Sequence, residues 1–168
     1  NPAFAEYDTV IRMDSNYVLA YFDRAISRYD LIRLIHSLDD YQEEITIGKK
    51  QSDLRSQLQT DDPQNTYENV IRDLTTVIRL DPDFSFAFYN RGFIYAQMGE
   101  YRLALEDFSS AISLRPEFPE AFYNRGLIRI LQGEAGKGCE DLSRAGELGI
   151  LDAYKVMKRY CFKDTAPD

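Results

Sequence analysis

The residue types that carry out catalysis are scarce and scattered in this chain. The single histidine, His36, has no cysteine or second histidine near it, so it predicts neither a metal site nor a base beside a nucleophile. The sequence contains no glycine-rich phosphate-binding loop. Two carboxylate pairs, Asp39-Asp40 and Glu43-Glu44, are better explained as a solvated helix face than as an acid–base pair. We therefore expect no enzyme activity, no catalytic residue, no metal and no cofactor.

The two cysteines offer a second kind of chemistry. Cys139 and Cys161 are too few for a disulfide framework. Cysteine outside such frameworks is mostly a small buried hydrophobe. We expect two buried structural thiols, with a disulfide or a metal role as the alternative.

Charge and hydropathy exclude other classes. The formal net charge is −8 and the pI is about 4.7, which disfavours nucleic acid as a partner because such binding needs a basic surface. No apolar run approaches the ~20 residues of a membrane span, so we expect no membrane partner. The sequence begins Asn1-Pro2 instead of Met, and we expect the native N-terminus to be missing. The compartment therefore stays unknown.

Asparagine and aromatic residues, in contrast, recur at a fixed spacing. The hexapeptide Ala-Phe-Tyr-Asn-Arg-Gly occurs at 87–92 and at 121–126, which start 34 residues apart. A fixed period of this length is typical of stacked helical repeats. Such an array presents an extended concave surface for binding and seldom encloses a catalytic pocket.

The residues around the first hexapeptide complete a known pattern. Residues 85–118 carry aromatic, glycine, alanine and proline residues at set positions: Phe88, Gly92, Tyr95, Ala104, Phe108, Ala111 and Pro116. In this they resemble the tetratricopeptide repeat (TPR) family, in an array fragment of bacterial type. Arg91 departs from the pattern, since the family usually has leucine there. The resemblance implies an all-α fold, a right-handed α-solenoid of helix-turn-helix repeats with a C-terminal capping helix.

Small residues in this pattern have expected packing roles. Gly92 and Ala104 should let the two helices of the repeat approach closely. Gly149 should cap the helix that precedes the last one.

The repeat pattern also sets boundaries within a single TPR domain over residues 1–168. The expected parts are the second helix of a truncated repeat at 1–14, a repeat at 15–84 with an insertion around 34–65, repeats at 85–118 and 119–151, and a capping helix at 152–163. In the insertion, the helix that starts near Tyr17 should run on to Gly48, and a short helix should follow through Leu54 and Leu58. The insertion is either a tolerated surface excursion or an arm that contacts a partner.

The two ends of the array raise separate questions. The first helix of the truncated repeat is absent, so Phe4, Tyr7, Val10 and Ile11 should be exposed and should favour a homodimer. The capping helix carries basic residues that solvate its outer face or, alternatively, form a basic ligand site: Lys155, Lys158, Arg159 and Lys163.

The resemblance further implies which residues line the concave groove. Family members use the second, fifth, sixth, ninth and twelfth positions of each first helix. The fifth, sixth and ninth positions here are Phe22, Asp23 and Ile26; Tyr89, Asn90 and Phe93; and Tyr123, Asn124 and Leu127. An asparagine amide can donate to a peptide carbonyl and accept from a peptide N–H, so it suits an extended peptide. The alternative is that the asparagines bond to their own helices and the tyrosines pack between repeats.

Some family members instead hold the C-terminal carboxylate of a chaperone with lysine and arginine. The corresponding positions here are Leu19, Phe22, Phe86, Tyr89, Glu120 and Tyr123. None of these side chains is a charge-assisted donor, so binding of a chaperone tail is disfavoured.

Arginine recurs at the seventh position of each first helix, and aspartate recurs in each facing helix. The matched pairs are Arg24 with Asp73, Arg91 with Asp107, and Arg125 with Asp141. We expect a repeated ion pair within each repeat. A row of anion-binding arginines is the alternative, which the nearby aspartates disfavour.

These features predict a scaffold for protein–protein interaction that binds an extended peptide or partner segment in its groove. An assembly or oligomerisation module of a larger TPR array, and a non-catalytic domain of a multidomain enzyme, are the alternatives.

Overall fold

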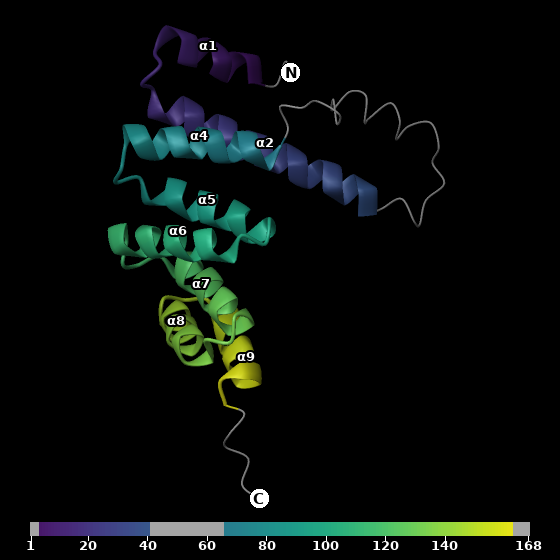
Figure 1. Cartoon of the computed structure of the whole chain (residues 1–168), viewed down its shortest axis with the longest axis vertical. Coiled ribbons are helices and arrows are strands. Elements are labelled where there is room, and N and C mark those ends of the chain that lie inside the picture. Colours follow the sequence, from purple (N-terminus) through teal and green to yellow (C-terminus); the bar gives the residue numbers. More distant parts are fainter. Residues whose placement is uncertain (1–3, 41–65, 163–168) are drawn as a thin grey trace, which may run out of the picture. The chain divides into compact units, whose positions relative to one another are not determined.

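A computed structural model describes residues 4–40 and 66–162, and every regular element in these ranges is an α-helix. The helices are α1 (Ala5–Met13), α2 (Val18–Asp40), α4 (Tyr67–Leu80), α5 (Ser85–Gln97), α6 (Tyr101–Leu114), α7 (Pro119–Leu131), α8 (Ala135–Glu147) and α9 (Leu151–Tyr160) (Figure 1). They fall into two compact units, Asn1–Pro82 and Asp83–Asp168. The all-α repeat fold is thereby confirmed, whereas the single-domain boundaries stay a prediction.

In unit 1 the first helix of the repeat, α2, is unusually long. Helix α2 has 23 residues and packs against α1 and α4, whereas α4 has 14 residues. The expected extension of this helix past its usual end is confirmed as far as Asp40. The predicted stop at Gly48 and the short helix through Leu54 and Leu58 lie outside the described residues.

The N-terminal helix is less exposed than its sequence predicts. Phe4 is only 2% exposed, and its ring lies 5.4 Å from the guanidinium carbon of Arg28 on α2. The Tyr7 hydroxyl is 3.2 Å from that of Ser27, also on α2. The expectation that Phe4 is exposed was wrong, because α2 covers one side of α1. The proposed homodimer stays a prediction. The exposed apolar surface of α1 that could form it consists chiefly of Val10 and Met13.

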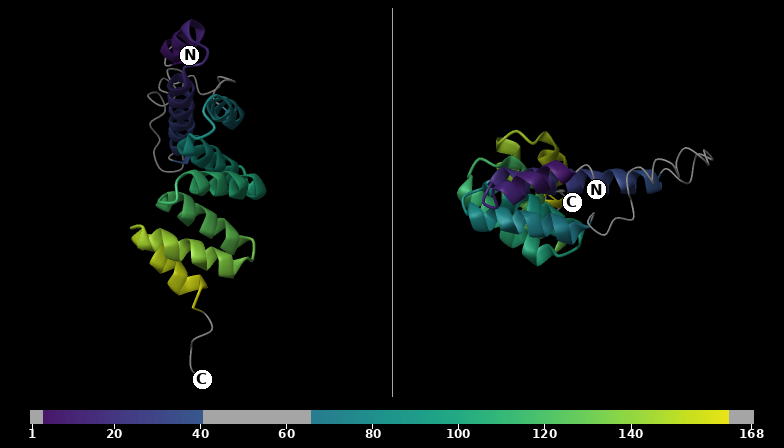
Figure 2. Two further views of the ribbon diagram at one scale, coloured as in Figure 1. Left: turned by 90° about the vertical axis from the view of Figure 1, so that its left-hand side faces the viewer. Right: turned by 90° about the horizontal axis from the view of Figure 1, so that it is seen from above.

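Unit 2 stacks its helices in chain order, each helix packing against the next from α5 to α9 (Figure 2). Pro116 follows the end of α6 and Pro119 begins α7, the helix positions that tolerate a missing N–H. The turn before α9 contains Gly149 with a φ of +110°, a conformation that favours glycine. This confirms the cap predicted at that residue.

Small residues let the paired helices of unit 2 approach closely. A Cβ at Gly92 would lie 3.2 Å from the Ala104 carbonyl oxygen, and one at Gly126 would lie 2.9 Å from the Gly138 carbonyl oxygen. Phe108 and Leu142 are fully buried beside these two contacts. The close approach expected from Gly92 and Ala104 is therefore present.

The cysteines correct the sequence analysis. Cys139 on α8 and Cys161, directly after α9, form a disulfide with an S–S distance of 2.02 Å. The expectation of two buried free thiols was wrong, because α9 folds back along α8 and brings together residues 22 positions apart. The bond fastens the end of the capping helix to the last repeat.

Within residues 4–40 and 66–162, none of the helices combines the length and apolar character that a membrane span requires.

Candidate functional site

Six of the nine predicted groove residues come together in unit 2. Tyr89, Asn90 and Phe93 lie on α5, while Tyr123, Asn124 and Leu127 lie on α7. Helices α5 and α7, the first helices of the two repeats, contact each other. The amide nitrogen of Asn124 donates to the Tyr89 hydroxyl at 3.2 Å. The other three residues, Phe22, Asp23 and Ile26, lie on α2 in unit 1. Unit 2 thus contains a continuous candidate site that spans two repeats.

The two asparagines occupy the same position in successive repeats and keep part of their hydrogen-bonding capacity. The amide nitrogen of Asn90 donates to the Phe86 carbonyl oxygen at 2.7 Å, one turn earlier in α5. The local bonding weighed as an alternative is therefore present for the amide nitrogen. Neither the Asn90 nor the Asn124 carbonyl oxygen has a hydrogen-bond partner among the described residues. Each side chain can still accept one bond and donate another.

The aromatic residues of the site are anchored in the core. The Tyr89 ring centroid lies 4.7 Å from that of Phe118 and 5.8 Å from that of Phe108. Tyr123 packs, with Leu127, against the buried cluster that contains Leu142. The packing role weighed as the alternative for the tyrosines is thus realised. Each tyrosine directly precedes an asparagine and is held by packing against the core.

Each repeat contains an arginine–aspartate ion pair. Each seventh-position arginine donates from Nε and Nη2 to both oxygens of its aspartate: Arg24 to Asp73 at 2.9 and 2.6 Å, Arg91 to Asp107 at 2.8 and 2.8 Å, and Arg125 to Asp141 at 2.9 and 2.7 Å. The predicted pairing within each repeat is confirmed. Such bidentate hydrogen bonds hold the guanidinium in place, so the arginine is not available to bind another anion.

Burial and pairing shift the titration of the middle pair. The bonds to Asp107 raise the pKa of the Arg91 guanidinium. Burial raises the pKa of the Asp107 carboxyl, in spite of the bonds from Arg91. The Asp107 carboxylate is therefore poorly solvated, and the bonds from Arg91 offset only part of this effect on its pKa.

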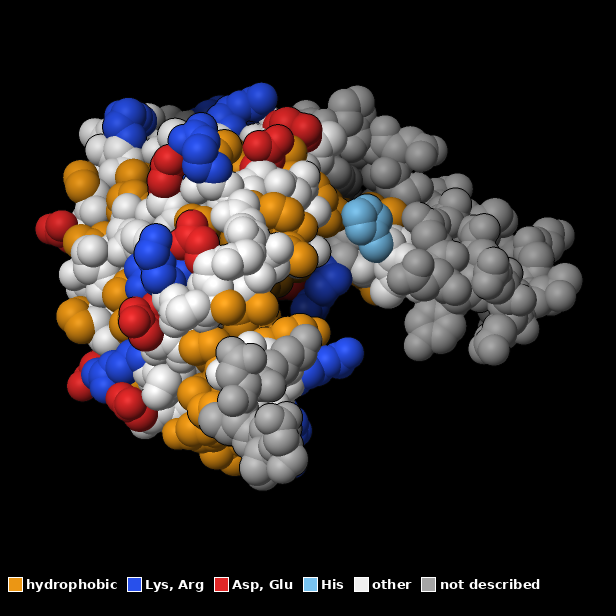
Figure 3. All heavy atoms as spheres, turned by 60° about the horizontal axis from the view of Figure 1, so that its bottom comes forward, with side chains coloured by type: hydrophobic (Ala, Val, Ile, Leu, Met, Phe, Trp, Pro, Cys, Tyr) orange, Lys and Arg blue, Asp and Glu red, His pale blue; other side chains and the backbone are white. Residues whose placement is uncertain are grey.

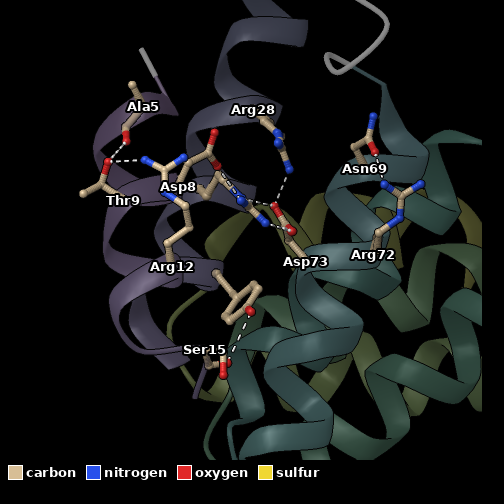
Figure 4. A network of polar contacts seen from close by, with 11 residues as sticks. Ala5, Asp8, Thr9, Arg12, Ser15, Arg28, Asn69, Arg72 and Asp73 are labelled. Carbon is tan, nitrogen blue, oxygen red and sulfur yellow. Dashed lines mark hydrogen bonds and ion pairs between the residues drawn. The ribbon is translucent and has the colours of Figure 1, made fainter. Parts of the chain in front are cut away.

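Two repeats contain a second arginine that the sequence analysis missed. These arginines lie four residues after the paired ones: Arg28 donates to Asp73 (Figure 4). Arg129 donates to Asp141 at 2.7 Å. Burial lowers the pKa of Arg28. Tyr95 takes this place in the middle repeat. The i, i+4 spacing on one helix face was the available signal.

An apolar pocket lies where α7 meets the capping helix. It has a volume of about 370 Å³ and is lined by Leu127, Ile130, Leu131, Val156 and Tyr160. Figure 3 shows hydrophobic side chains gathered in the lower half of the view, which faces the C-terminal end of unit 2. Leu127 belongs to the predicted groove, so the pocket continues that surface.

The described part of the chain has no group of three His, Cys, Asp or Glu residues that could hold a metal ion. His36 is exposed and lies edge-on to Tyr67, with ring centroids 6.2 Å apart.

Comparison with known proteins identifies the repeat. The family model described as "Tetratricopeptide repeat" matches residues 85–118, the unit formed by α5 and α6. Residues 85–118 are therefore a tetratricopeptide repeat. No curated protein matches its sequence.

Three solved structures are similar to this chain. The first TPR of Spaghetti (RPAP3), bound to the HSP90 peptide SRMEEVD, has 22% identity and a TM-score of 0.55, covering 58% of this chain and 79% of that one. MamA has 22% identity and a TM-score of 0.49, covering 94% and 90%. The second TPR of Spaghetti, bound to the same peptide, has 28% identity and a TM-score of 0.48, covering 49% and 76%. The first of these likenesses supports the all-α repeat fold.

The TPR pattern also accounts for a site residue that was not singled out. Ile130 is the twelfth residue of the first helix that begins at Pro119, one of the positions that line the groove in this family. The pocket residues Val156 and Tyr160 gave no such signal, because they lie on the capping helix, which departs from the repeat pattern.

Proposed function

We propose that this TPR protein is an interaction module that holds an extended segment of a partner protein against the face shared by α5 and α7. One observation carries the proposal: Asn90 and Asn124 lie at the same position of neighbouring first helices, each with an unbonded carbonyl oxygen among the described residues. A peptide backbone offers N–H and C=O groups, and an amide side chain can bond to both. Phe22, Asp23 and Ile26 would supply the equivalent contacts in unit 1.

The side chains around the asparagines argue against a chaperone tail as the ligand. The Spaghetti domain with the same fold was solved with an HSP90 peptide. In this chain the positions that would need lysine or arginine carry Phe86, Glu120 and tyrosines instead. A terminal carboxylate would therefore find no cation at these positions. We propose an internal, extended segment as the ligand, held through its backbone and its apolar side chains.

A second role as an assembly module has one observation in its favour. Met13 on α1 is 84% exposed, and Val10 on the same helix is 38% exposed. These side chains are placed to contact a preceding repeat or a second copy. The proposed homodimer rests on them and is separate from the groove.

Peptide selection tests the proposed groove and does not require an identified partner. Peptides selected from a random library on the oxidised chain should bind wild type and lose affinity for the Asn90→Ala/Asn124→Ala variant. Each lost amide contact should cost about 1 kcal/mol, so the double variant should bind roughly 30-fold more weakly.

Matched controls give this experiment its specificity. Ser110→Ala/Ser113→Ala removes two hydroxyls of α6 that bond to carbonyls of their own helix, and it should leave the affinity unchanged. The HSP90 peptide SRMEEVD should bind poorly. Selected peptides that bind the asparagine variant as tightly as wild type would show that the groove assignment is wrong.

A further inference from the structure

The pocket between α7 and α9 is apolar on every side that the structure describes. Its lining consists of three aliphatic residues of α7, then Val156 and Tyr160 of α9, and none of these side chains is charged. Leu131 is 66% exposed and Tyr160 is 42% exposed. Apolar side chains grouped around a recess mark a contact site more often than a plain surface does.

The α9 wall of this pocket is held in place by the disulfide. Ala153 is the one residue of α9 that is fully buried, so packing alone holds the far end of this helix weakly. Cys161 follows Tyr160 directly and is bonded to Cys139 of α8. The bond therefore fixes Tyr160 at the pocket. A preformed recess binds more tightly than one that must be ordered first.

A cation lies beside the same wall. The guanidinium carbon of Arg159 is 5.4 Å from the centroid of the Tyr160 ring. Arg159 is exposed and has no ion pair with any described residue. The positive charge of Arg159 therefore has no carboxylate partner in the described part of the chain, as is also true of Lys158. An acidic group on a partner would complement this charge.

We propose that the α7–α9 pocket receives one bulky aliphatic or aromatic side chain of a bound peptide, with an acidic residue beside it that pairs with Arg159. This inference rests on the proposed function and names the chemistry of the partner segment. The pocket shares Leu127 with the groove, so a segment that crosses Asn124 toward the capping helix would place a side chain in it.

Designed peptides test this inference directly. The probe is a short glycine–serine peptide that carries one phenylalanine between two aspartates, capped at both ends. Two matched peptides replace the phenylalanine with alanine or both aspartates with lysine. On the oxidised full chain, each replacement should weaken binding about tenfold or more, because it removes either the buried ring or the charge complement.

Methyl NMR of the same samples locates the peptide. The phenylalanine peptide should shift the methyl signals of Leu127, Ile130, Leu131 and Val156. Leu131→Ser/Tyr160→Ser should abolish these shifts and weaken binding about tenfold, whereas Leu151→Ser should change neither. Leu151 is the matched control because it is an apolar residue of α9 that is more exposed than Leu131 or Tyr160 and does not line the pocket.

Charge reversal provides a second readout. Arg159→Glu should favour the lysine peptide over the aspartate peptide, and an unchanged preference would overturn the pairing with Arg159. Binding that shifts the Asn90 and Asn124 amides without the pocket methyls would overturn this inference and support the groove. Binding at the pocket alone would support this inference and contradict the groove. Absence of binding by all three peptides would overturn the inference.

Discussion

The two complete repeats of unit 2 make the same fold with different chemistry. In the repeat at 85–118, Gly92 faces Ala104, and one arginine bonds to Asp107. In the next repeat, Gly126 faces Gly138, and Asp141 is bonded by both Arg125 and Arg129. The repeat that matches the family model therefore uses a tyrosine, Tyr95, where the terminal repeat uses a second arginine.

The difference shows which features the fold requires and which it tolerates. Both repeats keep a small residue at the helix crossing, because backbones in contact leave no room for larger groups. Both also keep a bidentate arginine–aspartate pair. The repeat at 119–151 packs against α9 as well as against the preceding repeat, and a disulfide joins it to α9. The predictions below separate these contributions.

The largest contrast should come from removing one arginine in each repeat. Arg91→Leu leaves the buried carboxylate of Asp107 without a described partner and should lower the free energy of unfolding by about 2–4 kcal/mol. Arg129→Leu leaves Asp141 bonded to Arg125 and should cost less than about 1 kcal/mol. Urea unfolding of the two variants measures the contrast. Equal losses would mean that the second arginine is as necessary as the first.

Removal of the disulfide should act on the terminal repeat. Cys139→Ser/Cys161→Ser opens a link between residues 22 apart and should cost up to about 3 kcal/mol. Hydrogen exchange should rise in α9 and stay low in α5 and α6. A reducing agent should reproduce this pattern in wild type and leave the variant unaltered. Protection of α9 that survives reduction would show that packing alone holds the cap.

The contact between α7 and α8 at Gly126 and Gly138 should tolerate no added methyl group. A Cβ at Gly138 would lie 2.6 Å from Cγ1 of Ile130 and 2.9 Å from the Gly126 carbonyl oxygen. Gly138→Ala should therefore destabilise the protein by about 1–3 kcal/mol. Gly136, on the same helix, has no such atom within 4 Å, so Gly136→Ala should stabilise by up to about 1 kcal/mol. Thermal melts in parallel compare the two, and similar melting temperatures would contradict the close contact of α7 with α8.

The smallest effect concerns pH. Because burial raises the pKa of Asp107 in the folded state, the folded chain takes up this proton before the unfolded chain does as pH falls. This contribution to stability is present below the unfolded pKa and is lost as pH rises through the folded value. Wild type should thus gain stability relative to Asp107→Asn on acidification toward pH ~4. A loss of stability relative to Asp107→Asn would mean that the bonds from Arg91 lower the pKa of Asp107 by more than burial raises it.

The sequence was the best guide to contacts in which a side chain has one partner at a fixed spacing. The pairs of Arg91 with Asp107 and of Arg125 with Asp141 follow from the repeat period, because each repeat places the same two positions face to face. The fold and the role of Gly149 followed in the same way. These features depend on local geometry that repeats along the chain.

Features that depend on a departure from the repeat were missed. The disulfide and the pocket both need α9 to fold back along α8, and the period ends before that helix. Phe4 was expected to be exposed because its own repeat is incomplete, yet α2 covers it. The sequence left two roles open for the tyrosines, since a ring that packs in the core and one that lines a groove share the same spacing.

The most direct test of the proposed groove is a titration of the oxidised chain with a library-selected peptide, followed through side-chain amide signals in ¹H–¹⁵N spectra. The account predicts that the amide signals of Asn90 and Asn124 shift together and saturate with one Kd, while backbone signals of α6 stay in place. Saturable binding that moves signals of α6 or α8 and leaves both asparagines unchanged would contradict it.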